Sequence, residues 1–450
     1  MKPGAFRISL SITILSALLF VPTEASSQQT ADAIWAPWVT KTTEHSATVN
    51  WQGAKTETGS VDFATSAYYD KNKSFEKTVT SKVKAAYQHV PLTDLVPGTP
   101  YVYRVRPSGT APVSANRAFR TMPLKGPFTF IVMSDSQEGH TYTEAMRFKY
   151  VADAVAKETD ALFVLHGGDY AGHDSTGLWA KYFEVADPML AKMAIFPTIG
   201  NHEYHSSAST DPDTASATAS PGDGSGPTTA VEFHSSYDTD VTYSFDVAGI
   251  QFIVLATPDP AGCVNTDDPH TSLALAEQQV PFLQEKLTSP RLGTFTIHHH
   301  PIWDYGRDNS NPDLDPWATL YQTHGISATF SGHTHNYQRY SVQGIPYFVV
   351  GNAGGRFSDL IDGQPFAPWY VLGKTKNLGY LRVHVDPEAG TAKAEEVFAA
   401  FVLEDDSPET PQVYDPPKVF DTVSFPLHQR LTLFYVLQAS QEFFVAAFKF

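Results

Sequence analysis

The spacing of hydrophobic and polar positions divides the chain into two parts. Between residues 33 and 121, short β-prone runs alternate with turn residues, for example at 47–51, 60–64 and 101–105. No segment of helical period interrupts these runs. They therefore predict an all-β domain of short strands.

The spacing of hydrophobic positions changes after residues 121–127, a stretch that contains proline and glycine and marks the domain boundary. Residues 128–133 and 161–165 are apolar and predict strands, whereas 143–157 and 179–192 have helical spacing. This alternation of strand and helix predicts an α/β layered domain.

The pattern continues to about residue 385. Further strands are predicted at 194–199, 242–246, 251–255, 294–297, 326–330, 345–350 and 381–385, and a further helix at 273–287. The strands on either side of Gly249 predict a hairpin, and the last two strands are expected to complete the sheet.

Periodicity weakens in the last part of the chain, 389–450, which we treat as a C-terminal extension. An acidic, proline-rich passage at 404–418 predicts a linker. The tail 431–450 is apolar but is interrupted by two glutamines and a glutamate, which disfavour a membrane span. It is either a packed terminal element or a surface segment for interaction.

Side chains of the kinds that bind metals follow the predicted strands of the second domain. Open α/β sheets bind ligands at the carboxyl ends of their strands, so we expect these side chains to converge. They are Asp135, Asp169, Asn201, one histidine of the run His298, His299 and His300, and the pair His333 and His335.

Simpler explanations exist for some of these residues. Consecutive residues of an extended chain point to opposite faces, so the three adjacent histidines cannot all reach one site. Taken alone, Asp135 or Asp169 is explained as a helix cap. The His-x-His pair behind Gly332, taken alone, is explained as a solvated loop.

Carboxylate, amide and imidazole donors suit a pair of hard-to-borderline metal ions better than a cysteine-rich structural zinc site. One carboxylate shared by two ions would hold them roughly 3.5–4 Å apart, the spacing at which two metals bind the oxygens of a phosphoryl group. Asp169, which follows two glycines, is the predicted bridge. Iron, zinc and manganese are all candidates.

The order of these residues resembles that of the calcineurin-like binuclear metallophosphoesterases, and most closely the purple acid phosphatases. The five matching blocks are Asp135, Gly168-Asp169, Gly200-Asn201-His202-Glu203, His299-His300-Pro301 and Gly332-His333-Thr334-His335. The resemblance implies a four-layer α/β fold over residues 127–388, a β-sandwich of mixed sheets flanked by helices.

The first domain, 33–121, resembles an immunoglobulin-like or fibronectin type III sandwich, which the purple acid phosphatases carry before their catalytic domain. Residues 95–101 look like its tyrosine corner, and Trp51 is placed as its core aromatic residue. Because this fold carries many functions, a structural or docking role is preferred to carbohydrate binding.

The resemblance also implies roles for single residues. Asp135, Asp169 and His335 would hold the first metal, and Asp169, Asn201, His299 and His333 would hold the second. His202 would donate a proton to the leaving oxygen, with Glu203 tuning it, while a metal-bound hydroxide attacks phosphorus in line.

One position departs from the purple acid phosphatases. Their iron-binding tyrosine lies three residues after the bridging aspartate, where this chain has Gly172, and Tyr170 is out of register. We therefore expect neither the purple colour nor an obligatory Fe(III). Gln137 stands where some relatives carry a histidine ligand, so it either completes the first site or serves as a hydrogen-bonding group.

Charge and composition restrict the partners. The chain of 450 residues has a net charge of −17, which argues against nucleic acid or an anionic membrane as a stable partner. A phosphate ester is compatible, because bound cations reverse the field inside one cleft. The polar tract at 206–229 is a tolerated loop or a lid beside the site.

The first residues have the pattern of an export signal. Lys2 and Arg7 precede an apolar run at 8–21, and small residues follow at 25–27. We expect residues 1–27 to be removed; an uncleaved anchor is disfavoured because the run is shorter than the ~20 residues of a spanning helix. Cys263 is the only cysteine, so no intrachain disulfide is expected.

These features together predict a secreted or periplasmic, metal-dependent phosphatase of the acid-phosphatase type that acts on phosphate monoesters. One alternative is a phosphodiesterase or nucleotidase of the same family. The other is a binding protein with an inert catalytic domain, against which the intact ligand set argues.

Overall fold

The computed structural model describes the following residues of the chain: 33–107, 113–137, 146–172, 176–203, 233, 242–257, 273–306, 311–360, 369–403 and 410–430. The predicted export signal at 1–27, the polar tract at 206–229 and the apolar tail at 431–450 lie outside the described residues.

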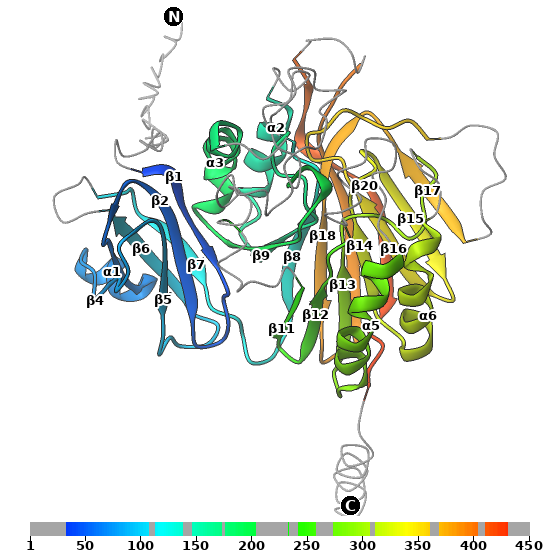
Figure 1. Ribbon diagram of the computed structural model, residues 1–450, viewed down its shortest axis with the longest axis horizontal. Helices are drawn as coiled ribbons and strands as arrows, with labels where there is room; N and C mark the ends of the chain where they lie inside the picture. Colours follow the sequence, from blue (N-terminus) through cyan, green and yellow to red (C-terminus); the bar gives the residue numbers. More distant parts are fainter. Residues whose placement is uncertain are drawn as a thin grey trace, which may run out of the picture.

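The first seven strands form a β-sandwich of two antiparallel sheets, at the blue end of the chain in Figure 1. One sheet has the order β1 (Ala33–Thr40), β2 (Ala47–Glu57) and β5 (Ala85–Leu92); the other has β4 (Lys77–Thr80), β3 (Ser60–Thr65), β6 (Pro100–Arg106) and β7 (Arg117–Arg120). Trp51 is fully buried between them, and the Tyr101 hydroxyl accepts a hydrogen bond from the Val96 N–H at 2.9 Å. The prediction of an all-β first domain is confirmed, and its fibronectin type III character stays a prediction.

One short helix, which no segment of helical period in the sequence indicates, lies between two strands of this sandwich. Helix α1 (Ser66–Asn72) begins after Thr65, whose side chain accepts a hydrogen bond from the Tyr68 N–H, and ends at Lys73 in the left-handed conformation. None of its residues is buried, so the helix has no apolar face to leave a periodic pattern in the sequence.

The second part contains two large mixed sheets packed face to face. The six-stranded sheet has the order β10 (Ala194–Pro197), β9 (Ala161–His166), β8 (Phe128–Met133), β18 (Asn377–Asp386), β19 (Thr391–Phe401) and β20 (Gln412–Pro426). The seven-stranded sheet has the order β11 (Tyr243–Val247), β12 (Ile250–Val254), β13 (Gly293–Ile297), β14 (Ala328–Ser331), β16 (Ile345–Val350), β15 (Tyr337–Val342) and β17 (Tyr370–Lys374).

Phenylalanine rings fill the space between these two sheets. Phe130 of β8 contacts Phe252 of β12 and Phe330 of β14 across the interface, with ring centroids 5.1 and 5.9 Å apart. The alternate residues of β8, Ile131 and Met133, face the opposite side of their sheet. Successive side chains of a strand point to opposite faces, and every residue of this largely apolar strand is buried, so both of its faces are covered.

Helices cover the two outer faces. Helices α2 (Arg147–Val155) and α3 (Thr176–Leu190) pack on the six-stranded sheet, and α5 (Leu273–Thr288) and α6 (Asp315–His324) pack on the seven-stranded sheet. Two short 3₁₀ helices, η2 (Asn201–Glu203) and η5 (Pro312–Leu314), lie in the connections. The predicted four-layer α/β arrangement is confirmed.

Two details of the sequence prediction are wrong. The strands expected to complete one sheet, now β16 and β18, belong to different sheets. The passage predicted as a linker contains the start of β20, which pairs along β19 in an antiparallel ladder. Most side chains of β20 are exposed or half-buried, because it is an edge strand, so its sequence lacks a clear apolar pattern.

Aromatic packing and one buried ion pair join the β-sandwich to the α/β part. Trp35 of β1 stacks on Phe183 of α3 with ring centroids 4.6 Å apart. Arg117 of β7 donates to Asp187 of α3 at 2.6 Å, and both side chains are buried. Within the described ranges, no helix has the length and apolar character that crossing a membrane requires.

Candidate metal centre

The candidate ligands lie in loops that leave neighbouring strands. β8, β9 and β10 are parallel neighbours in one sheet, and β13 and β14 are parallel neighbours in the other. Parallel strands present their carboxyl ends at one edge, so their exit loops meet there. The structure brings together all six predicted ligands: Asp135, Asp169, Asn201, His299, His333 and His335.

Three buried side chains form the first group of donors. Asp135, Asp169 and His335 each offer one ligand atom, and these atoms all lie within 4.8 Å of one another. Asp135 Oδ1 is buried and has no hydrogen-bond partner among the described residues; His335 Nε2 lies 3.3 Å from it. A buried carboxylate oxygen without a donor is unfavourable unless a cation is close. The first group therefore fits a metal ion.

The second group surrounds the side-chain oxygen of Asn201. His299 Nε2 lies 3.0 Å and His333 Nδ1 3.1 Å from Asn201 Oδ1. His299 Nε2 also lies 3.4 Å from Asp169 Oδ2. Asp169 thus belongs to both groups, which is the position of a bridging ligand.

Backbone carbonyls fix the orientation of two of the imidazoles. His299 Nδ1 lies 2.8 Å from the Gly167 carbonyl oxygen, and His335 Nδ1 contacts the Arg356 carbonyl oxygen. A carbonyl only accepts, so Nδ1 carries the hydrogen in each ring and Nε2 faces the centre. Metal-binding histidines characteristically have such a partner on the outer nitrogen.

The three consecutive histidines point in different directions. His298 packs against Trp317 and holds the His300 carbonyl through Nδ1 at 2.7 Å. The His300 ring lies beside Thr257, with Nδ1 3.0 Å from its hydroxyl, and 4.2 Å from the His333 ring. Only His299 of the three reaches Asp169 and Asn201 in the contacts described.

The loops hold their ligands in uncommon backbone conformations. Asp135, Asp169 and His333 have φ of 61°, 56° and 64°, in the left-handed region that side chains with a Cβ rarely adopt. At Gly332 an added Cβ would overlap Ser134 and the Asp135 carboxylate, and at Gly200 it would overlap the Asp169 carboxylate. Local strain of this kind is concentrated at functional sites.

The centre favours positive charge. Although burial opposes ionisation, the positive charge of His299, followed by that of His202, holds the pKa of Asp169 well below its usual range. Although burial also opposes protonation of His299, the Asp169 carboxylate raises the pKa of His299 to about 9. The carboxylate and the imidazole therefore favour a positive charge between them, which a bound metal ion would supply in place of the proton.

His202 lies at the opening of the centre. Its side chain is 21% exposed, whereas the Asp169 side chain beside it is 1% exposed. The backbone N–H of His202 donates to Asp169 Oδ1 at 2.9 Å. In its ring, Nδ1 contacts the Gly172 carbonyl oxygen and Nε2 lies 3.8 Å from Asp169 Oδ2. The ring is therefore oriented by its outer nitrogen, as in the ligand histidines.

Glu203 supports the loops that carry the ligands. Its carboxylate accepts hydrogen bonds from the backbone N–H groups of Asp169, Tyr170 and Gly200 at 2.7–3.0 Å. Burial, followed by repulsion from Asp169, raises the pKa of Glu203 to about 8, and the three N–H donors act in the opposite direction. The role shown by these contacts is to join the two exit loops.

Two residues singled out in the sequence take structural positions. The Tyr170 hydroxyl donates to the Thr198 carbonyl at 3.2 Å, and its ring stacks on His166 with centroids 4.0 Å apart. Gln137 donates from Nε2 to Asp169 Oδ2 at 3.2 Å. In these contacts Gln137 acts as a hydrogen-bond donor to the carboxylate that the two donor groups share.

The sequence did not single out Asp304, which holds the His-x-His loop. Its carboxylate is buried and accepts from Thr334 Oγ1 at 2.6 Å, from Gln338 Nε2 at 2.7 Å and from the Gly306 N–H at 2.7 Å. Thr334 lies between the two histidines of that loop. The only signal was a charged residue shortly after the His-x-Pro block, which is too weak to identify such a role.

Comparisons with known proteins agree with this geometry. Residues 128–337 match the family model of calcineurin-like phosphoesterases. Among solved structures, the chain is similar to a purple acid phosphatase isolated from yellow lupin (Lupinus luteus) seeds, with 13% sequence identity over 87% of this chain and 74% of that one, and a TM-score of 0.64. It is similar to the structure of PhoD at 13% identity over 90% of this chain and 92% of that one, with a TM-score of 0.63. A comparison with curated protein sequences gives no match.

The two solved structures share the fold, whereas the family match covers the residues that carry the chemistry. All six candidate ligands and His202 lie within the matched residues 128–337. The donor groups described above fit the two metal ions on which this family depends. The chain therefore contains a calcineurin-like phosphoesterase domain and is an enzyme of the metal-dependent phosphoesterase class.

Proposed function

We propose that the protein is an exported phosphatase that hydrolyses phosphate monoesters with two metal ions. The observation that carries the proposal is the position of Asp169, whose carboxylate lies within reach of both donor groups. Export rests on the signal pattern at 1–27.

The two donor groups would hold one ion each. Asp135, Asp169 and His335 would hold the first, and Asp169, Asn201, His299 and His333 the second. When bound, the ions supply positive charge that polarises the phosphoryl oxygens. Because the donors that the described residues bring together are oxygen and imidazole groups, iron, zinc and manganese all suit the centre.

His202 is the proposed proton donor. The Gly172 carbonyl orients its ring, and its Nε2 lies 3.8 Å from Asp169 Oδ2, facing the centre. It is also more exposed than Asp169, so a substrate can reach it. In its protonated form the imidazole can transfer a proton to the oxygen that leaves phosphorus.

Replacing Asn201 with alanine tests the proposal. It removes the atom on which two histidine nitrogens converge, so hydrolysis of 4-nitrophenyl phosphate should fall at least a hundredfold, as for loss of a metal ligand or its support. The matched control is Asn72→Ala in the β-sandwich, whose exposed side chain is far from the centre in sequence and fold. Unchanged turnover in Asn201→Ala, with the metal content intact, would contradict the proposal.

The preference for monoesters needs a separate measurement. Values of kcat/KM for 4-nitrophenyl phosphate and bis(4-nitrophenyl) phosphate should differ at least tenfold in favour of the monoester. A preference for the diester would assign the protein to the phosphodiesterase alternative while leaving the metal centre as described.

A further inference from the structure

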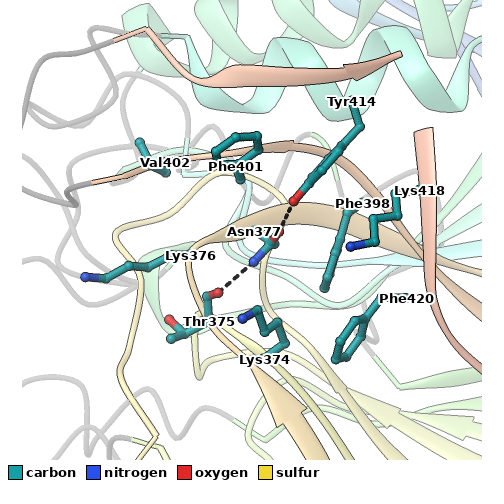
Figure 2. Close-up of a pocket in the computed structure, with 10 residues that line it drawn as sticks. All are labelled: Lys374, Thr375, Lys376, Asn377, Phe398, Phe401, Val402, Tyr414, Lys418 and Phe420. Carbon is teal, nitrogen blue, oxygen red and sulfur yellow. Dashed lines mark hydrogen bonds between the residues drawn. The ribbon is translucent and has the colours of Figure 1, made fainter. Parts of the chain in front are cut away.

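A cleft lined by aromatic and cationic side chains lies where the edges of the two large sheets meet (Figure 2). Its lining residues come from the turn between β17 and β18, from the end of β19 and from β20, and include none of the candidate metal ligands. The cavity volume is about 430 Å³. This is within the usual range for small-molecule sites.

Four aromatic rings line the cleft. Phe398 and Phe420 stack with ring centroids 4.9 Å apart, and Phe401 and Tyr414 pair at 5.0 Å. Phe398 is buried, whereas the other three rings are half-buried and present part of their surface to the cavity. Exposed ring surface in a concave site favours the stacking of a flat, apolar group.

Hydrogen bonds fix one wall in place. The Tyr414 hydroxyl donates to Asn377 Oδ1 at 3.0 Å, and Asn377 Nδ2 donates to the Thr375 carbonyl at 2.8 Å, as Figure 2 shows. Asn377 is buried, so this connection is protected from water. The ring of Tyr414 is therefore preorganised before any ligand binds, which lowers the entropic cost of binding.

Three lysines line the same cleft, and none of its ten lining residues is acidic. Among the residues that the structure describes, Lys374, Lys376 and Lys418 form no ion pair. Lys418 Nζ lies 5.7 Å from the centroid of the Tyr414 ring, whereas Lys376 extends away from the rings in Figure 2.

Lysines on edge strands also have a simpler role. β17 and β20 are edge strands of their sheets, and lysine there prevents pairing with another chain. That role does not require a cavity or half-buried rings beside the charges. The combination of unpaired Lys374 and Lys418 with an aromatic lining instead matches a ligand that has both a ring and negative charges.

We propose that this cleft binds a small aromatic anion, a flat ring that carries two or more negative charges. The ring packs against Phe401, Tyr414 and Phe420, and the anionic groups face the ammonium groups of Lys374 and Lys418. This site is separate from the metal centre and does not depend on the proposed phosphatase activity.

Calorimetric titration of the metal-loaded, full-length chain with naphthalene-1,5-disulfonate tests the proposal. The probe has a flat ring and two permanent charges and contains no phosphate ester. We expect saturable binding at one site, weakened about fivefold or more in Lys374→Ala and in Lys418→Ala, the size expected for one partly exposed charge pair. The control Lys84→Ala, an exposed lysine on the β-sandwich, should leave the affinity unchanged.

Further controls test the ring and the charges of the probe separately, and distinguish the cleft from the metal centre. Sulfate, which lacks the ring, and 1-naphthalenemethanol, which lacks the charges, should each bind at least tenfold more weakly than the probe. The metal-centre variant Asn201→Ala should keep the affinity of the parent protein. Absence of binding, lysine variants that bind the probe as tightly as the parent protein, or loss of binding in Asn201→Ala would each overturn the proposal, and the lysines would then serve only to protect the sheet edges.

Discussion

Replacing Asp304 with asparagine tests how the His-x-His loop is held against the metal centre. The Asp304 carboxylate is 1% exposed and accepts three hydrogen bonds, one of them from Thr334 between His333 and His335. Asparagine keeps the shape but removes the charge and turns one acceptor oxygen into a donor. Of these three donors, only the Thr334 hydroxyl can turn to accept from the new amide, because Gln338 Nε2 and the Gly306 N–H can only donate.

The size of the effect follows from the change in these bonds. A hydrogen bond to a charged group contributes about 1.5–3 kcal/mol, and one between neutral groups about 0.5–1.5 kcal/mol. With the pairing preserved, Asp304→Asn should lower the free energy of unfolding by about 1–3 kcal/mol. Metal affinity should also fall by about tenfold, the lower end of the range for outer-shell partners of metal ligands.

Two measurements check this prediction. Urea unfolding of the metal-free protein gives the free energy of unfolding, and competition with a chelator gives the metal dissociation constant. The control Asp70→Asn changes the same charge in an exposed pair with Lys73 and should alter neither quantity. If Asp304→Asn destabilises the fold but leaves the metal affinity unchanged, then Asp304 supports the fold alone and the reasoning about the loop is refuted.

Three further predictions follow from the packing. Gly200→Ala should abolish metal binding measured by calorimetry, because the added Cβ would overlap the Asp169 carboxylate. Its control is Gly177→Ala in helix α3, where the added Cβ meets open space and should raise the free energy of unfolding by about 0.5–1 kcal/mol. Arg117→Ala should lower that free energy by about 3–5 kcal/mol in urea unfolding, since Asp187 is left buried and unpaired, and replacing both residues with apolar ones should restore most of it. Burial raises the pKa of Glu396 to about 8 in the folded protein, from about 4.5 in the unfolded chain. The protonated carboxyl therefore contributes fully to stability below pH 4.5, and this contribution is lost as the pH rises to about 8. Glu396→Gln should therefore reduce the loss of stability between pH 5 and pH 8 by up to about 4 kcal/mol, measured by unfolding at both pH values, and an unchanged pH dependence would contradict this assignment.

The strands that carry the ligands were readable from the sequence because they are buried on both faces. β8, which precedes Asp135, is apolar except for Thr129, and its predicted bounds agree with the structure. Polar residues directly after such strands are conspicuous, so the candidate ligands could be collected before their positions were known. The expectation that they converge needed only the rule that parallel strands end at the same edge.

Elements at the periphery were not readable for the opposite reason. α1 buries no side chain, and β20 is an edge strand with mostly exposed side chains, so neither has a clear apolar period. α6 did leave a signal, since Trp317 and Tyr321 are buried one helical turn apart, but Pro312 and Pro316 at its start obscured it. The role of Asp304 depends on contacts between loops, which no local pattern encodes.

The site destabilises the loops at the ends of these strands, whereas packing of the strands stabilises the fold. Asp135, Asp169 and His333 are held in the left-handed region, at a cost of about 1–3 kcal/mol for each such residue. Burial of Asp169 beside Glu203 adds charge repulsion, visible in the raised pKa of Glu203. The phenylalanine layer behind these loops provides the compensation, because burying each such ring contributes about 1.5–3 kcal/mol. A ligand cluster that is strained and rich in negative charge can therefore persist only at the ends of strands packed on both faces, and bound cations would relieve the part of the cost that is electrostatic.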